Sequence, residues 1–218
     1  MLSRMTDTTP GPSRSHRRLE LLATLLLAFA TLGTAWSAYQ SREWTGEQSQ
    51  AYSRATANRI AVNRESAVAN RQVQIDVATF VQWVDATERG NKRLADFYRQ
   101  RFRDEFKPAF DAWLATKPLT SPTAPETPFA MSEYRLASNA EADRLEAAAG
   151  AESNKAKDAN ERANDYMLAV VLFASALFFA GLSTKLESSG QRRAVLALGC
   201  VLFLGTLVYL ATLPVRVI

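Results

Sequence analysis

The chain has 218 residues, a formal net charge of +4, one cysteine and one histidine. A single cysteine excludes an intrachain disulfide, and one cysteine far from one histidine leaves zinc sites, Cys–His pairs and Ser–His–Asp triads without their parts. Acidic and basic residues are interleaved and no basic block dominates, so the composition does not indicate nucleic-acid binding. We therefore expect no metal site, no cofactor and no nucleic-acid partner.

The first apolar segment is formed by residues 19–39, after a tail of residues 1–18 that we expect to be disordered and cytoplasmic. About twenty apolar residues cross a hydrocarbon core of about 30 Å. A signal peptide has a shorter apolar core and a small-residue cleavage site, which Ala28–Ala30 imitates inside the apolar run. Trp36 and Tyr39 fall where an interfacial aromatic belt would lie. An uncleaved transmembrane helix is therefore predicted, with a cleaved signal peptide as the alternative.

Two further apolar segments, residues 166–184 and 194–213, carry no charged residue and predict a second and a third transmembrane helix. The loop between them, residues 185–193, is short and contains Lys and Arg, as does the N-terminal tail. Short basic segments favour the cytoplasmic side, and three spans place both there together. Residues 40–165 and the tail 214–218 are then extracytoplasmic.

The helix that begins in the first span is predicted to continue to about Arg89, because no proline follows until Pro108 and Gly90 supplies a helix stop. Gly46 is the predicted place of a bend. Small and then bulky apolar residues follow at gaps of three, four or seven, which is typical of a coiled-coil-like stripe. The stripe consists of Ala51, Ala55, Val62, Ala69, Val73, Val77, Phe80 and Val84.

A second extracytoplasmic helix is predicted from about Asn91, and the Lys107–Pro108 pair should kink or split it. Residues 117–129 hold four prolines and predict an exposed connector. From Met131 the chain is predicted to be helical again and to run directly into the second span. Residues 51–75 carry a net charge of +3 and residues 131–165 a net charge of −3.

Opposite charges favour antiparallel packing of these two segments, although each exposed pair contributes only about 0–1 kcal/mol. Burial of the apolar stripes must supply most of the stability. The predicted fold class is therefore all-α: an integral membrane protein with three transmembrane helices and an extracytoplasmic hairpin of long, coiled-coil-like helices.

Three Asn-Arg pairs, at residues 58–59, 63–64 and 70–71, form the most unusual local pattern. Arg64 and Arg71 are two helical turns apart and share a face, whereas Arg59 points elsewhere. One interpretation is a polar seam that binds an anionic partner or lines a central vestibule in an oligomer. The other is a solvated helix face paired to the acidic third helix.

An aromatic cluster in the same domain allows two interpretations, a docking surface or the core of a helical cap. Its period of three and four residues favours the core. The cluster contains Phe80, Trp83, Phe97, Phe102, Phe106, Phe110 and Trp113. Carboxylate pairs such as Asp104–Glu105 have no recognisable catalytic set around them, so we expect no catalytic residues and no enzyme.

The predicted spans contain one charged residue, Glu20, at the cytoplasmic edge of the first span, whereas ion-coupled sites normally require buried Asp, Glu, Lys or Arg. Small residues in them, Ala176, Ala180, Gly199 and Gly205, predict close helix contacts. These features favour packing or oligomerisation over transport.

The sequence of Ala35–Trp44, AWSAYQSREW, precedes a helical segment rich in Gln, Ala, Asn and Arg. In this motif and in the order of its membrane helices, the chain resembles uncharacterised bacterial inner-membrane proteins that share a domain of unknown function. The resemblance implies their topology and a bacterial envelope setting. It implies no activity and no functional residue.

The function predicted from these features is that of a non-enzymatic bacterial inner-membrane protein whose extracytoplasmic domain self-associates or docks an envelope partner. The alternative is an oligomeric pore-forming or transporter-associated subunit with an Asn/Arg-lined vestibule. The expected partners are the lipid bilayer and either a second copy or another membrane protein, and the sequence indicates no particular small-molecule ligand. The candidate interaction residues are Ala51, Ala55, Arg59, Val62, Arg64, Ala69, Arg71, Phe102, Phe106, Phe110 and Trp113.

Overall fold

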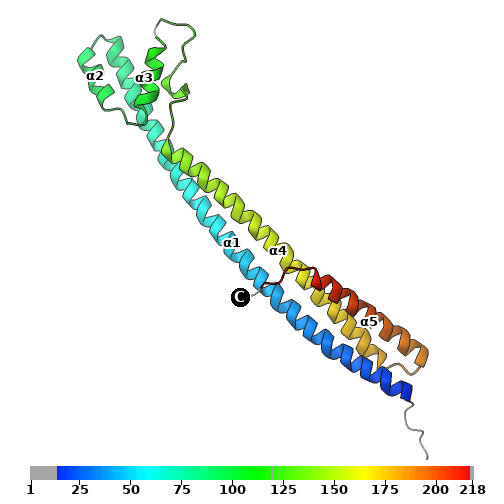
Figure 1. Cartoon of the computed structure of the whole chain (residues 1–218). Coiled ribbons are helices and arrows are strands. Elements are labelled where there is room, and N and C mark those ends of the chain that lie inside the picture. The colour runs from blue at the N-terminus through cyan, green and yellow to red at the C-terminus, as the bar shows by residue number, and fades with distance from the viewer. Residues whose placement is uncertain (1–13, 119, 217–218) are drawn as a thin grey trace, which may run out of the picture. The chain divides into compact units, whose positions relative to one another are not determined.

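The structure is a computed structural model, which describes residues 14–118 and 120–216. Within these residues every regular element is a helix, so the all-α prediction is confirmed for this part of the chain (Figure 1). The elements are α1 (Arg14–Glu88), α2 (Lys92–Gln100), α3 (Lys107–Ala115), the 3₁₀ helix η1 (Pro128–Ala130), α4 (Ala137–Ser183) and α5 (Ser189–Ala211).

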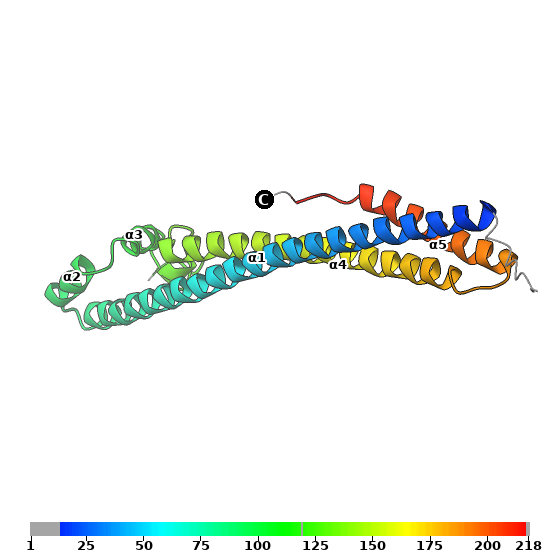
Figure 2. The same cartoon turned by 90° about the horizontal axis from the view of Figure 1, so that it is seen from below.

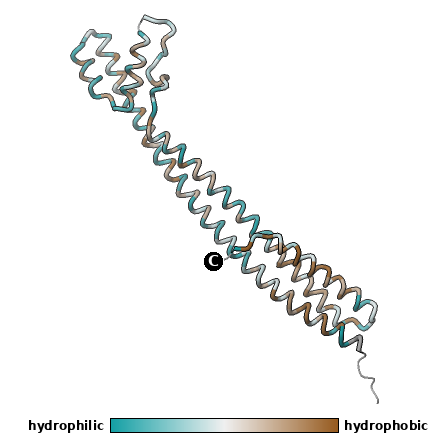
Figure 3. Tube along the Cα trace, viewed as in Figure 1, coloured by the Kyte–Doolittle hydropathy of each residue, from teal (hydrophilic) through white to brown (hydrophobic). Residues whose placement is uncertain are grey.

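Three helices, α1, α4 and α5, are long and apolar enough to cross a membrane. Figure 3 shows their apolar residues gathered along the first part of α1, the last part of α4 and all but the start of α5. These features are compatible with a multi-pass membrane protein. The described chain divides into two compact units, residues up to Ala51 with those from Asn154 onward, and Tyr52–Ser153.

The first unit contains the apolar helices, which lie side by side in Figures 1 and 2. Its helices approach closely at glycines: a Cβ added to Gly33 would lie 2.8 Å from the Phe173 ring, and one added to Gly199 would lie 3.4 Å from backbone atoms of α4. The predicted close contact at Gly205 is not observed, because a Cβ there would meet nothing within 4 Å. Many large apolar side chains face outward, among them Leu21, Leu32, Phe178, Val201 and Val208.

The segment after α5 is held against the first unit by polar side chains. The buried Gln40 amide donates to the Arg216 carbonyl oxygen and accepts from the Arg216 backbone N–H, both at 3.0 Å. The Tyr166 hydroxyl donates to the Pro214 carbonyl at 3.2 Å. The Arg216 guanidinium also forms an ion pair of 2.7 Å with Glu47. These side chains therefore satisfy backbone groups of Pro214 and Arg216, which lie after the end of α5 and have no helical hydrogen bonds.

The second unit contains the last part of α1, the short helices α2 and α3, η1 and the first part of α4. Aromatic rings from α1, the segment between α2 and α3, α3, η1 and the segment after η1 form one core. Gly90 follows α1 with φ +68°, a conformation that glycine adopts without strain, so the predicted helix stop lies where α1 ends. α1 continues without a break through Gly46, where a bend was predicted.

Two boundaries of the second unit differ from prediction. The second helix is split at residues 101–106 rather than at Lys107–Pro108, because Pro108 lies in the first turn of α3, where a missing N–H costs nothing. The helix predicted from Met131 begins at Ala137 instead. Met131 and Tyr134, in the non-helical segment after η1, pack against the aromatic core, so the chain there is not part of α4.

Candidate interaction surface

The predicted stripe of small residues on α1 is buried within the chain. Ala51, Ala55 and Ala69 are essentially inaccessible, and Val62 is half-buried. In the second unit α1 and α4 run antiparallel and side by side (Figures 1 and 2). Small residues allow two helices to approach closely. We therefore correct the prediction that these four residues form an intermolecular surface and assign them to the interior of the chain.

The buried stripe of α1 also differs from the predicted one at its bulky end. Val77 is 39% exposed, whereas Asp76 and Trp83 are buried. The spacing explains the difference, because residues 69, 73, 76, 80 and 83 follow gaps of four and three and stay on one face. The inner stripe, as we call it, consists in the second unit of Ala55, Val62, Ala69, Val73, Asp76, Phe80 and Trp83.

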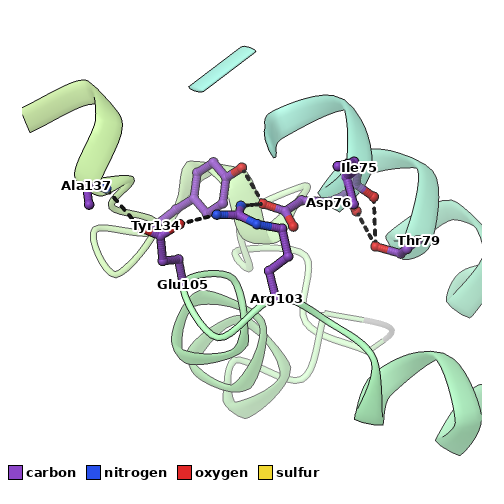
Figure 4. A network of polar contacts seen from close by, with 7 residues as sticks. All are labelled: Ile75, Asp76, Thr79, Arg103, Glu105, Tyr134 and Ala137. Atoms are coloured by element: carbon purple, nitrogen blue, oxygen red, sulfur yellow. Dashed lines mark hydrogen bonds and ion pairs between the residues drawn. The ribbon is translucent and has the colours of Figure 1, made fainter. Parts of the chain in front are cut away.

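Asp76 is a fully buried carboxylate at the centre of a polar network (Figure 4). Its Oδ2 atom forms an ion pair of 2.8 Å with the Arg103 guanidinium and accepts a hydrogen bond of 3.0 Å from the Tyr134 hydroxyl. Arg103 also pairs with Glu105, and Glu105 accepts a hydrogen bond of 3.0 Å from the Ala137 backbone N–H. The network therefore joins α1, the segment between α2 and α3, and the first residue of α4.

Burial dominates the electrostatics of this network. It raises the pKa of the Asp76 carboxyl above its ordinary value, and the Tyr134 hydrogen bond and the Arg103 charge offset only part of this rise. Burial and the bond to Asp76 also raise the pKa of the Tyr134 hydroxyl. The Asp76 Oδ1 atom is buried and accepts no hydrogen bond from the described residues. A carboxylate enclosed in this way acts as a tie between segments.

The two carboxylates considered for acid–base chemistry both have structural partners. Asp104 forms an ion pair of 2.7 Å with Lys107, and the hydrogen bond and charge of that lysine lower the pKa of the Asp104 carboxyl. Glu105 contacts Arg103 and supplies the N-terminal hydrogen bond of α4. Among the described residues, no group of three His, Cys, Asp or Glu side chains lies close enough to hold a metal ion.

The predicted aromatic residues Phe102, Phe106, Phe110 and Trp113 are buried in the core of the second unit, the second of the two interpretations offered above. Phe97 does not join them: it is 46% exposed, with the Arg101 guanidinium 3.6 Å from its ring centroid.

A groove of about 460 Å³ lies at the edge of this core, and the proline-rich connector forms one wall. The Trp113 indole N–H donates to the Pro125 carbonyl at 2.8 Å, which fixes the connector to the core. The residues that line the groove are Phe80, Trp83, Val84, Thr87, Glu88, Trp113, Pro118, Ala124, Pro125 and Glu126.

The arginines of the Asn-Arg region differ in their contacts. Arg54 forms an ion pair of 3.3 Å with Glu152, and Arg59 donates to the Ser153 hydroxyl at 2.9 Å, so both contact α4. Arg64 and Arg71 are exposed, and neither forms an ion pair or hydrogen bond with another described residue. The pairing of α1 with the acidic helix therefore accounts for part of the cationic pattern and leaves Arg64 and Arg71 without a polar partner among the described residues.

These two arginines belong to a second stripe on α1. Its members follow gaps of four, three, four, four and three, so they share a face, and all six are exposed. Two of them are large and apolar, Ile60 at 59% exposure and Ile75 at 53%. We call this set the outer stripe: Ile60, Arg64, Ala67, Arg71, Ile75 and Ala78.

Comparison with known proteins finds no matching family model, no matching curated protein and no matching solved structure. The assignment of a site therefore depends on the geometry of this chain. Sequence reasoning missed Asp76, Tyr134, Gln40 and Gly33. The spacing of Asp76 could have identified it, because it follows the same gaps of three and four residues as the apolar members of the inner stripe. An acidic residue at such a core position requires polar partners.

Proposed function

We propose that this chain is a non-enzymatic, multi-pass protein of the bacterial inner membrane. Its N-terminus is cytoplasmic, and residues 40–165 form a helical domain outside the cytoplasm that self-associates or docks an envelope partner. Three apolar helices and the outward-facing apolar side chains of the first unit support membrane insertion. The basic residues of the N-terminal tail and of the loop 185–193 support the orientation.

The observation that carries the proposal is the outer stripe of α1. A helix that already buries one face against α4 is stabilised no further by isoleucines on the opposite face unless another molecule covers them. Arg64 and Arg71 lie between those isoleucines, and neither has a polar partner in residues 14–118 and 120–216. Apolar residues combined with arginine are typical of protein interfaces, in which arginine is enriched.

The bacterial envelope setting depends on the resemblance carried by Ala35–Trp44. The envelope setting and the orientation of the chain are both proposals. Both can be tested by cysteine accessibility, because Cys200 is the only native cysteine and the C200S chain offers a background free of thiols.

In that background we would introduce E88C, at the last residue of α1, and E187C, in the loop between α4 and α5. Both residues are exposed. A membrane-impermeant maleimide applied to spheroplasts is expected to label E88C at once and E187C only after the membrane is permeabilised. Labelling of E187C alone in intact spheroplasts would show the opposite orientation to the one proposed. Equal labelling of both cysteines in intact spheroplasts would contradict insertion in the membrane.

The docking role is tested by site-specific photo-cross-linking in living cells. A photoreactive amino acid at Ile75 should give a discrete protein adduct, because this side chain lies in the outer stripe. The control position is Ala151, an exposed residue on α4 that lies outside both stripes. Failure to form any protein adduct from Ile75 or Ile60 would contradict the docking role.

A further inference from the structure

The outer stripe requires a partner that presents negative charge. If the same stripe of a second copy packed against it around a two-fold axis parallel to α1, Arg64 would meet Arg64 and Arg71 would meet Arg71. Like charges at one level of a helix pair are unfavourable. A self-complementary contact of the outer stripe is therefore disfavoured, and the partner surface must differ from it.

The first part of α4 presents such a surface. Asp143 and Glu146 are three residues apart and exposed, and neither forms an ion pair with another described residue. Asn139 and Gly150 continue the same side of the helix at gaps of four, and both are exposed. The α4 acidic side, as we call these four residues, lies beside the face that packs against α1, because helical geometry places it next to the buried Ala142 and Ala149.

The two charged surfaces lie at the same level of the antiparallel pair. The ion pair between Arg54 and Glu152 sets the register of the two helices. Arg64 lies ten residues beyond Arg54, about 15 Å along α1, and Asp143 lies nine residues before Glu152, about 14 Å along α4 in the same direction. Arg64 and Asp143 therefore differ in level by only about 1–2 Å.

We propose that the outer stripe of one copy packs against the α4 acidic side of a second copy, with Arg64 between Asp143 and Glu146 of that copy. The proposal rests on the membrane topology proposed above, because copies inserted in one membrane share an orientation and residues at equal levels then meet. Ile60 and Ala67 flank Arg64 and approach the small residues of the acidic side. The contact is heterologous, so repetition of it gives a ring if the rotation between copies closes and an open row of copies if it does not.

Intermolecular proximity is tested in the full-length C200S chain with one pair of cysteines, A67C and N139C. Residue 139 lies level with residue 67 on the acidic side, as the Arg54–Glu152 register requires. The matched control replaces N139C by A137C, an exposed position two residues away on the opposite side of α4. Treatment of membranes with a short bifunctional maleimide is expected to give a dimer-sized band for A67C with N139C, at least fivefold stronger than for the control.

Charge reversal tests the electrostatic part of the contact. In the A67C/N139C chain, R64E with R71E should lower the cross-linked fraction at least fivefold, and D143K with E146K should do the same. The four reversals combined should restore it, because the charges are then exchanged between the two surfaces. All four side chains are exposed, and equal thermal melting of the variants verifies that each remains folded. Cross-linking that is insensitive to both double reversals, or that the combination fails to restore, overturns the proposal.

The outcomes separate this inference from the proposed function. Strong cross-linking of A67C with A137C and not with N139C would overturn the inference and leave self-association standing. Adducts of Ile75 with a different protein and no dimer-sized band would overturn the inference and leave partner docking standing. Absence of every adduct overturns both.

Discussion

The Tyr134→Phe substitution tests whether the Asp76 network holds the second unit together. The phenol hydroxyl donates one of the two interactions that the buried Asp76 carboxylate receives, and the carboxylate oxygen Oδ1 has none from the described residues. A hydrogen bond to a charged group contributes about 1.5–3 kcal/mol. Because Tyr134 is only half-buried, we expect a loss of about 2 kcal/mol, at the lower part of this range.

The assay is hydrogen exchange with mass spectrometry on the full-length protein in detergent. The exchange rate of a backbone amide reports the free energy of local opening, and a loss of about 2 kcal/mol corresponds to roughly thirtyfold faster exchange. The acceleration should appear in peptides that contain Asp76 and the start of α4, and not in peptides from α5. The control is Tyr98→Phe, because the Tyr98 ring packs against the same core and its hydroxyl forms no hydrogen bond with a described residue.

The pH dependence of the Tyr134→Phe effect has a definite sign. The folded-state pKa of Asp76 lies above the ordinary value of 3.8, so its contribution to stability is fully present below 3.8 and is lost as the pH rises through the raised pKa. Removing the Tyr134 hydroxyl removes a cause that lowers this pKa, so the pKa rises further. The destabilisation should therefore be small below 3.8 and grow with pH. A pH-independent effect, or one equal to that of Tyr98→Phe, would refute the reasoning.

Two further predictions concern packing and the connector. Gly33→Ala should lower the free energy of unfolding by about 1–3 kcal/mol, because the added Cβ would lie 2.8 Å from the Phe173 ring. The control is Gly205→Ala, which should lower the thermal midpoint less because its Cβ would meet nothing within 4 Å. Equal shifts of the thermal midpoint in the two variants would contradict the contact at Gly33. Trp113→Phe should cost about 1 kcal/mol through the lost bond to the Pro125 carbonyl. Limited proteolysis should then cut the connector faster, and an unchanged cleavage rate would argue against that bond.

Local patterns of the sequence were sufficient to predict much of the fold. Hydropathy located the apolar parts of α1, α4 and α5, because the length needed to cross a membrane is a property of a continuous segment. The end of α1 was predicted by Gly90, whose left-handed conformation is a local property. The split between α2 and α3 was predicted near Pro108 and lies just before it.

Features that depend on distant partners were not predictable from local patterns. Asp76 is 27 residues from Arg103 and 58 from Tyr134, and nothing near Asp76 in the sequence indicates either contact. The start of α4 at Ala137 depends on Glu105, which lies 32 residues earlier. Propensity alone extended that helix to Met131, because it takes no account of a capping partner in another segment.

The sequence was sufficient to predict an interaction surface on α1 but not to identify the residues that form it. The sequence indicated a stripe of small residues, and small residues serve equally within a chain and between chains. Only the structure places Ala55 and Ala69 inside and Ile60 and Ile75 outside. The interpretation of the Asn-Arg pairs divides in the same way, since Arg59 contacts α4 and Arg64 does not.

The two arginines of the outer stripe lead to a last prediction about specificity. A stripe of isoleucine and alanine alone would pack against its own copy as a parallel coiled coil. Arg64 and Arg71 oppose this arrangement, so they select a different partner surface at a cost in affinity. R64L with R71L should therefore strengthen association and change its geometry. With a single cysteine, A67C in the C200S chain, a dimer linked through residue 67 of both copies should form in the leucine variant and be weak in the arginine parent. Equal amounts in both would mean that these arginines do not determine which surfaces meet.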